Sequence, residues 1–250
     1  MNLGTQAIRI ARALQIALIG TLGMVLCACG MTPQDEAEAV ERGILQTPGA
    51  EKLWAAIKAE YPEDFAILVE RIRNASPAEL ADAARAEAIG AQWLREFFDR
   101  ISADSVKAPA AEMIAWSAAE HELYAALQRS SVPDCAAMTM GEWIFIEDSG
   151  SATAAAIARR NEAMVRAAAA GRDDPQNYAE PDDGAFGVLG DAIAATGIDP
   201  ELQANLGSDQ AMAALSAEQQ CNLGVAVYKG LSAMPDDLEP QMAAYMLAPQ

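Results

Sequence analysis

The sequence predicts an all-α protein: a single irregular bundle of about eight to ten helices that follows a cleaved signal peptide. Apolar residues make up 52% of the 250 residues and charged residues 21%, which excludes a disordered polymer. Aromatic residues are only 6%, whereas alanine, the best helix former, is roughly a fifth of the chain. Apolar residues also recur at spacings of three and four, the period of one helical face.

The N-terminus has the three parts of a secretory signal. The first twelve residues contain Arg9 and Arg12 and no acidic residue, and residues 13–28 are apolar apart from Gln15 and Thr21. This apolar run of about 16 residues is shorter than the ~20 that a membrane-spanning helix needs. Residues 1–28 are therefore expected to be a signal peptide.

Leu26-Cys27-Ala28-Cys29 closes the apolar run, and its leucine, small residue and final cysteine resemble the lipobox of bacterial lipoproteins. The resemblance implies that the Cys29 thiol receives a diacylglyceryl group, that cleavage occurs before Cys29, and that the new amine is acylated, for example with palmitate. Cys27 departs from the usual pattern. The alternatives are an uncleaved anchor helix and ordinary signal cleavage. Two or three acyl chains would hold the protein on a membrane.

The resemblance also suggests a location, the periplasmic face of the cell envelope. Gly30 replaces the aspartate that retains enteric lipoproteins in the inner membrane, so the outer membrane is expected. Without residues 1–28, 15 basic and 36 acidic residues leave a net charge of −21. Such a charge disfavours both adsorption to anionic lipid and binding of nucleic acid. Residues 29–46 are expected to be the acylated N-terminus, a polar tether over 30–41 and the first helix.

Residues 47–250 are predicted to form one helical domain, in which proline and capping residues mark the helix starts. Ser76-Pro77-Ala78-Glu79 is a capping box with proline at the first helical position. Ser151 is expected to cap an alanine-rich helix that ends at Gly171. The other expected starts are Thr47-Pro48, Pro62, Pro109, Asp199-Pro200, Ser216-Ala217-Glu218-Gln219 and the segment between Pro235 and Pro240.

Two segments depart from the helical pattern. Residues 142–147 have strand propensity but no partner run, so we interpret them as a buried helical turn or an extended connector. Residues 172–184 are rich in aspartate and proline and are expected to be a loop, the best candidate for a seam. No repeat of 20–50 residues suggests a solenoid.

Cys135 and Cys221 are the two thiols that remain after lipidation, and in an oxidising compartment such a pair favours a structural disulfide. Cys135 is expected in a turn formed by Val132-Pro133-Asp134. The alternatives are two unrelated buried thiols, or a copper site in which Cys135 acts with Met138 and Met140 as soft sulfur ligands. Methionine is more often a core residue, so no metal is predicted.

No constellation of residues predicts an enzyme or a cofactor. Ser117 and His121 lie four residues apart on one helical face, but no orienting carboxylate or G-x-S-x-G turn accompanies them. A histidine hydrogen-bonded at a helix surface is the simpler interpretation. The acidic loop lacks the spacing of a calcium-binding loop; its polar residues are Asp173, Asp174, Asn177, Glu180, Asp182 and Asp183.

Three functions are therefore considered. The first is a membrane-anchored envelope lipoprotein whose non-catalytic helical domain binds an envelope protein or supports envelope structure. The second is a module that binds a small molecule or lipid in an apolar pocket between helices. The third is a hydrolase with an unrecognised site. The residues expected to line a pocket are Trp116, Trp143, Phe186 and the C-terminal methionines.

Overall fold

The computed structural model describes residues 32–81, 83–141 and 151–248, and this part of the chain forms thirteen helices and no strand. Ten helices have seven residues or more, which confirms the all-α class. The signal peptide, Cys29 and residues 142–147 lie outside the described residues. The helices are α2 (Pro33–Leu45), α3 (Glu51–Glu60), α4 (Pro62–Asn74), α5 (Pro77–Ala81), α6 (Ala83–Ser105), α7 (Ala110–Ser130), α8 (Val132–Thr139), α9 (Ala152–Asp173), α10 (Asp183–Ala195), α11 (Pro200–Gln203), α12 (Asp209–Ala213), α13 (Ala217–Leu231) and α14 (Glu239–Leu247).

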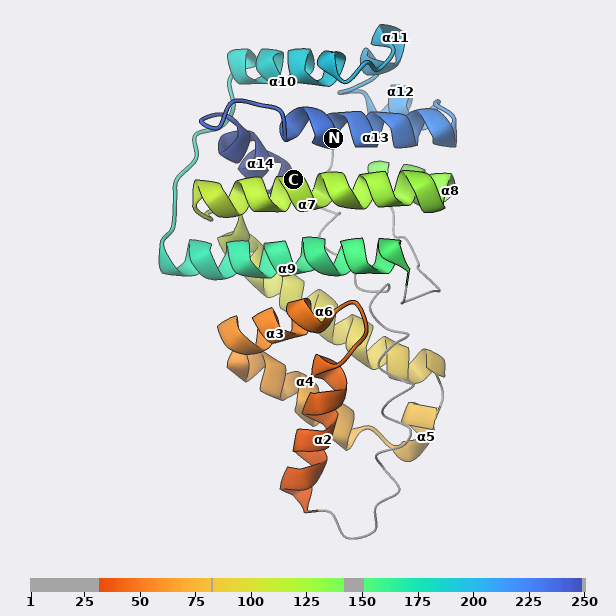
Figure 1. The fold of residues 1–250 in the computed structure, drawn as a ribbon, viewed down its shortest axis with the longest axis vertical. Coiled ribbons are helices and arrows are strands. Elements are labelled where there is room, and N and C mark those ends of the chain that lie inside the picture. Colours follow the sequence, from red (N-terminus) through yellow and green to blue (C-terminus); the bar gives the residue numbers. More distant parts are fainter. Residues whose placement is uncertain (1–31, 82, 142–150, 249–250) are drawn as a thin grey trace.

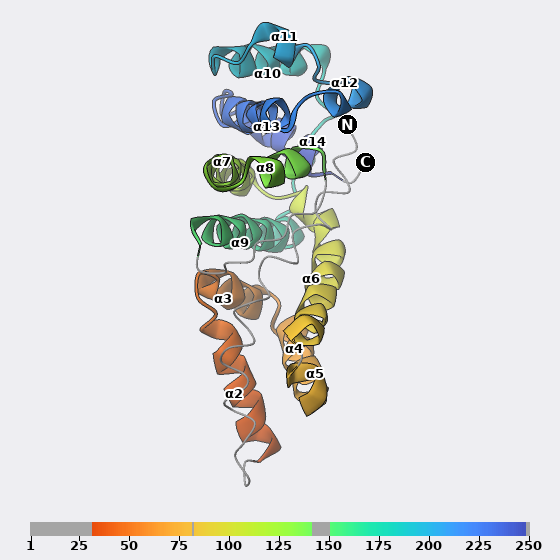
Figure 2. The same ribbon diagram turned by 90° about the vertical axis from the view of Figure 1, so that its right-hand side faces the viewer.

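The helices are stacked along the long axis of the molecule. In order from one end, α10, α13, α7, α9 and α3 lie one below another, and each packs against the next (Figures 1 and 2). Helix α6 crosses below α9, and α2 and α4 complete that end. Helix α14 packs against α7, behind α13 in Figure 1. No described helix is long and apolar enough to cross a membrane.

Capping side chains begin the helices where the sequence predicts. The Ser151 hydroxyl accepts a hydrogen bond from the backbone N–H of Ala154 at 3.1 Å. Ser216 and Gln219 form a complete capping box at the start of α13, in which each side chain accepts from the other residue's backbone N–H. The same reciprocal bonds join Ser76 and Glu79. These bonds satisfy backbone donors that an uncapped first turn leaves free.

Four expectations about boundaries are wrong. The helix expected to start at Thr47-Pro48 begins at Glu51. The tether expected over 30–41 is helical from Pro33, because Thr32 and Asp35 form a capping box. Helix α9 continues past Gly171 to Asp173. Gly171 serves close packing instead: a Cβ there would lie 2.0 Å from the carbonyl oxygen of Asp104 in α6. Helices α8, α10 and α12 were not expected; α8 replaces the predicted turn at 132–134.

The predicted loop forms the connection between α9 and α10, although residues 172 and 173 still belong to α9 and residues 183 and 184 already belong to α10. The backbone N–H of Gln176 donates to the carbonyl of Lys107 at 2.7 Å. The Tyr178 hydroxyl donates to the carbonyl of Ala108 at 2.8 Å. The connection is thus fixed along the side of the stack, and it brings α10 to the end opposite α2 (Figure 1).

Candidate functional site

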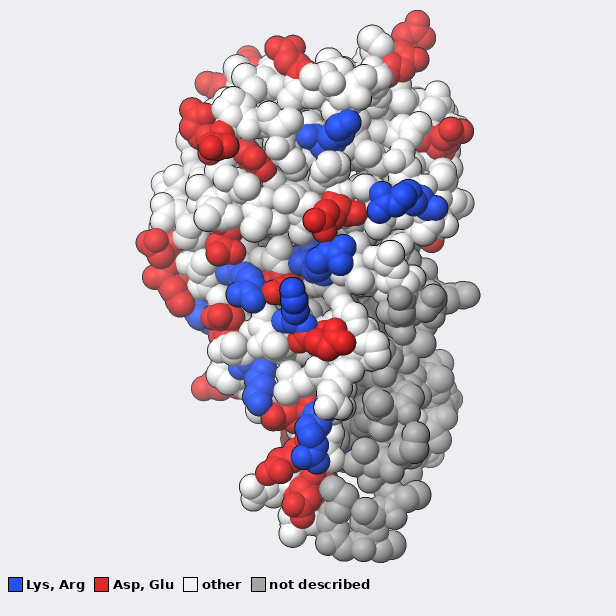
Figure 3. Space-filling view, viewed as in Figure 1, with Lys and Arg blue, Asp and Glu red and all other residues white. Residues whose placement is uncertain are grey.

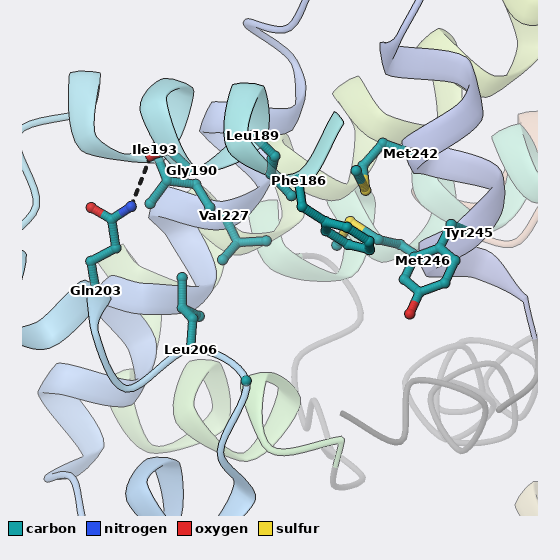
Figure 4. A pocket seen from close by; sticks show the side chains of 11 residues that line it. Phe186, Leu189, Gly190, Ile193, Gln203, Leu206, Val227, Met242, Tyr245 and Met246 are labelled. Atoms are coloured by element: carbon teal, nitrogen blue, oxygen red, sulfur yellow. Dashed lines mark hydrogen bonds between the residues drawn. The ribbon is translucent and has the colours of Figure 1, made fainter. Parts of the chain in front are cut away.

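An apolar pocket of about 370 Å³ opens at the α10 end of the molecule. It lies between α10, α13, α14 and the segment that contains α11, so its walls come from residues up to 60 positions apart (Figure 4). Its volume is at the lower end of the ~300–1,000 Å³ typical of small-molecule sites. The lining residues are Phe186, Leu189, Gly190, Ile193, Gln203, Leu206, Gly207, Val227, Met242, Tyr245 and Met246.

Two glycines shape the wall between α10 and α13. A Cβ at Gly230 would lie 2.8 Å from Cγ1 of Ile193, so the two helices approach closely at that level. Gly190 has the opposite role, because a Cβ there would have only Gln203 Nε2 within 4 Å, at 3.9 Å. The space that a side chain at position 190 would fill is therefore part of the pocket.

Helix α14 carries the methionine wall and is held by polar contacts at its start. Glu239, its first residue, is buried and accepts a hydrogen bond from the buried hydroxyl of Ser117 on α7. Burial raises the pKa of the Glu239 carboxyl, and the nearby Asp236 adds to this effect. The Gln241 side chain donates to the carbonyl of Ala179 in the α9–α10 connection at 2.9 Å. These contacts fix Met242 and Met246 opposite α10.

One hydrogen bond joins two walls of the pocket, and two aromatic rings lie at its opening. Gln203 Nε2 donates to the carbonyl of Gly190 at 2.8 Å and ties α11 to α10 (Figure 4). Phe186 is 41% exposed, and its ring meets that of Tyr245 edge-on at 5.4 Å between centroids. An exposed phenylalanine beside an open apolar cavity is a surface that can bind an apolar group.

The structure brings together only some of the predicted pocket residues. Phe186, Met242 and Met246 line the cavity, as expected. Trp116 does not, because its ring is buried in the core against Tyr228, and Trp143 lies outside the described residues. The rest of the α10 wall is not among the expected residues, although its signal is in the sequence. Asp182 caps the helix, and apolar residues then recur at spacings of three and four at positions 186, 189 and 193.

Ser117 and His121 do not form a catalytic pair in the part of the chain that the structure describes. The Ser117 hydroxyl is fully buried, and it donates to Glu239 rather than contacting His121. Partial burial, together with the charge of Lys229, lowers the pKa of His121. The simpler interpretation, a hydrogen-bonded surface histidine, is not observed either, since His121 makes no hydrogen bond to the described residues.

A buried ion pair lies between α7 and α9. Arg160 Nε donates to Glu120 Oε1 at 2.5 Å, and the two side chains are 3% and 2% exposed. The guanidinium also donates to Asn161 Oδ1 at 3.2 Å. Within the described residues no partner reaches Glu120 Oε2 or Asn161 Nδ2. Because solvent cannot reach this group of side chains, we assign it to structure rather than to ligand binding.

The predicted disulfide is present and joins α8 to α13. The Cα atoms of Cys135 and Cys221 are 5.0 Å apart, and both residues are buried. Cys135 lies inside α8 rather than in a turn, because Ser131 caps that helix and Pro133 suits its first turn. The bonded Cys135 is no free thiolate, so a copper site with Met138 and Met140 loses its strongest ligand.

The acidic loop provides no metal centre that the structure records. Among the described residues, no three His, Cys, Asp or Glu side chains are grouped so that they could hold a metal ion. Asp182 instead uses its carboxylate to cap α10, by accepting from the backbone N–H of Ala185 at 2.9 Å. Asp173 forms an ion pair with Arg172 at the end of α9.

Comparisons with known proteins give no relative for this chain. No protein-family model, no curated protein and no solved structure matches it. The pocket between α10, α13 and α14 is therefore the feature from which a function can be argued.

Proposed function

We propose that the protein is an envelope lipoprotein, anchored at the periplasmic face of the outer membrane by acyl chains on Cys29. The lipobox-like sequence at residues 26–29 supports this proposal. The Cys135–Cys221 disulfide also supports it, because structural disulfides belong to oxidising compartments such as the periplasm.

Substitution of the two neighbouring cysteines tests the anchor. Cys29→Ser should abolish incorporation of labelled palmitate and leave either an unprocessed precursor or a soluble form. Cys27→Ser is the matched control and should keep the label. Acyl label that persists in Cys29→Ser, or that is lost only in Cys27→Ser, would contradict the assignment of Cys29.

We further propose that the anchored domain acts by binding and not by catalysis, and that it holds an apolar ligand in the pocket described above. The observation that carries this proposal is the open cavity of about 370 Å³ with Phe186 exposed at its mouth. A folded domain gains nothing in stability from an exposed phenylalanine beside an unfilled apolar cavity, so such a feature favours binding.

A second candidate is interaction with an envelope protein partner. It is favoured by Ile67 on α4, which is 48% exposed beside a surface hollow that includes Glu70, Arg71 and Gln92. A photo-crosslinking residue at position 67 should capture one specific envelope protein if this function is correct. Capture of no specific protein would leave the pocket as the better-supported function.

A pair of glycine substitutions on α10 tests the pocket. Gly190→Leu places a side chain in the cavity. The matched control is Gly187→Leu, one turn earlier on α10. A Cβ at Gly187 would have nothing within 4 Å, and Gly187 does not line the pocket. Both changes favour a helix by up to about 1 kcal/mol, so both variants should fold. The neutral fluorophore N-phenyl-1-naphthylamine should bind the wild type and Gly187→Leu but not Gly190→Leu. Equal binding by all three would refute a pocket site.

A further inference from the structure

The pocket lies in the most acidic part of the chain. From residue 173 to the C-terminus the sequence contains thirteen aspartates and glutamates and one basic residue, Lys229. Figure 3 shows one face of the result: most basic side chains lie over α7, α9 and the helices below them, and acidic side chains dominate around α10 and α11. Charges of one sign around a low-dielectric cavity focus the potential at its mouth. A cationic ligand would therefore be attracted to this end of the molecule.

Lys229 does not neutralise the negative charge around the pocket. It follows Val227, which lines the cavity, by two residues on α13. Two residues turn about 200° around an α-helix, so Lys229 lies on a different face of α13. Its charge acts instead on His121 of α7 and lowers the pKa of that imidazole. The eleven lining residues include no lysine, arginine or histidine.

One acidic residue of α10 lies on the face that lines the pocket. Asp183 precedes Phe186 by three residues, which places the two on the same helical face. Asp191 is about 200° around the helix from Leu189 and Ile193, so it lies on a different face. Both aspartates are exposed. Neither side chain makes a hydrogen bond or ion pair with the described residues. The charge of Asp183 is therefore available to a ligand at the pocket.

The lining itself favours a cationic group over an anionic one. The rings of Phe186 and Tyr245 stand at 81° to each other, and the face of an aromatic ring attracts a cation within about 6 Å. The Gln203 amide donates one of its two N–H groups to the carbonyl of Gly190, and its oxygen Oε1 remains as an acceptor for a ligand. A carboxylate or phosphate head would meet no cationic side chain in the lining and would face acidic neighbours.

We propose that the ligand is a small amphiphilic cation, an alkylammonium whose tail fills the pocket and whose head lies at the mouth beside Phe186, Tyr245 and Asp183. This inference rests on the proposed binding function and adds the head-group charge to it. The tail supplies affinity through buried apolar area. The rings and the Asp183 carboxylate supply the selectivity for charge.

Three probes with the same eight-carbon tail separate the head group from the tail: octyltrimethylammonium, octyl glucoside and octanoate. They are titrated, below their micellar concentrations, into the full chain held in nanodiscs of neutral phosphatidylcholine, with Gly190→Leu as the pocket-blocked reference. The part of the binding that Gly190→Leu removes should be roughly tenfold tighter for the cation than for octanoate at low salt. The affinity for octyl glucoside should lie between those two affinities. Addition of 0.5 M NaCl should reduce the difference in affinity between the cation and octanoate.

Matched charge variants locate the source of the selectivity. Asp183→Asn should weaken binding of the cation several-fold and leave binding of octyl glucoside unchanged. Glu51→Gln removes the same net charge from an exposed position on α3, and it should leave all three affinities unchanged. An equal loss in both variants would assign the preference to the overall charge of the protein and overturn the inference.

The outcomes distinguish the two proposals. Binding that Gly190→Leu removes but that is equal for all three heads, or tightest for octanoate, overturns the cationic ligand and leaves the pocket function intact. A cation preference that persists in Gly190→Leu places the binding elsewhere on the acidic surface and also overturns the inference. Failure of all three probes, and of the neutral fluorophore, to bind in a Gly190-dependent way refutes both proposals.

Discussion

The two ends of the stack are built on different kinds of core. At the α2–α6 end, rings pack on rings: Trp93 and Phe97 are stacked with centroids 5.0 Å apart, and Tyr61 meets Phe97 edge-on at 5.3 Å. At the α7–α14 end, the core contains the Glu120–Arg160 ion pair, the Ser117–Glu239 hydrogen bond and a disulfide. The same end also holds an open cavity and Phe186 in contact with solvent.

This difference has a physical consequence for how each end responds to change. The phenylalanine rings of the aromatic core need no specific partner, so a smaller apolar side chain in their place costs packing alone. A buried charge or hydroxyl needs its own partner, and removal of that partner leaves an uncompensated polar group. The α7–α14 end should therefore depend on a few specific pairs, and on pH and redox state, whereas the α2–α6 end should depend on none of these.

The largest effect is expected from the disulfide. Cys135→Ser and Cys221→Ser should each lower the free energy of unfolding by about 4–5 kcal/mol, because the bond closes a loop of 86 residues. In a domain of this size each kcal/mol corresponds to roughly 2–4 °C in melting temperature. The double variant should be no less stable than either single variant, since both remove one shared bond.

Thiol titration of the denatured, non-reduced protein is the direct control for this prediction. It should find no free Cys135 or Cys221 thiol in protein purified from the periplasmic side. Additive losses in the double variant, or two free thiols for each chain, would show that the two cysteines contribute separately. The two ends would then not differ in how their stability depends on reductant.

Features of the fold that depend on residues close together in the chain could be predicted from the sequence. Ser151, Ser216 and Ser76 cap helices because a hydroxyl next to free N–H groups needs no tertiary partner, and these starts were predicted. Gly171 was misinterpreted because the same residue serves both helix ends and close helix contacts. Only the position of Asp104 on another helix decides between the two roles, and sequence spacing does not contain that information.

The next largest effect is expected at the buried ion pair. Glu120→Ala should cost about 3–5 kcal/mol, because it leaves the Arg160 guanidinium buried without a counter-charge. Its matched control is Glu122→Ala. That substitution breaks the Arg159–Glu122 pair between the same two helices, where the side chains are 51% and 59% exposed. The control should cost no more than about 1 kcal/mol.

Urea denaturation of the two variants measures this difference. The double variant Glu120→Leu/Arg160→Met should recover most of the loss, since it removes both charges and keeps apolar volume. Equal costs for Glu120→Ala and Glu122→Ala would show that the buried pair is no more important than a surface pair. The two ends of the molecule would then not differ in kind.

A smaller effect is expected at the aromatic end. Phe97→Leu should cost about 1–2 kcal/mol, because leucine stays apolar and loses only the contacts that the ring makes with neighbouring rings and with the Arg100 guanidinium. The loss should be the same at pH 5 and pH 8 and with or without reductant. A loss that changes with either condition would show that the two ends are coupled through α9, which packs against α3, α6 and α7.

The candidate site was less predictable than the fold. Phe186 and the C-terminal methionines could be named from residue type alone, since large apolar side chains near the C-terminus must pack somewhere. Gly190 and Gln203 could not be named, because their roles depend on one gap and one hydrogen bond between α10 and α11. Residue type alone cannot tell whether a tryptophan such as Trp116 lines a pocket or lies in the core. Only its packing against Tyr228 places Trp116 in the core.

The smallest effect is expected at Glu239, and its direction is set by pH. Burial raises the pKa of the Glu239 carboxyl in the folded protein, so the folded state holds this proton more tightly than the unfolded state does. The contribution of Glu239 to stability is therefore complete below the pKa of an unfolded glutamate, about 4.3, and is lost as the pH rises through the raised value.

Glu239→Gln keeps an oxygen that accepts from Ser117 but carries no charge. The variant should match the wild type in melting temperature near pH 4 and exceed it by a small margin at pH 8. Glu51→Gln, which removes a charge from the exposed first residue of α3, is the control and should give no such gain. A Glu239→Gln variant that is less stable than the wild type at pH 8 would show that the buried carboxylate stabilises α14 through its charge, and the α7–α14 end would then depend on pH in the opposite direction.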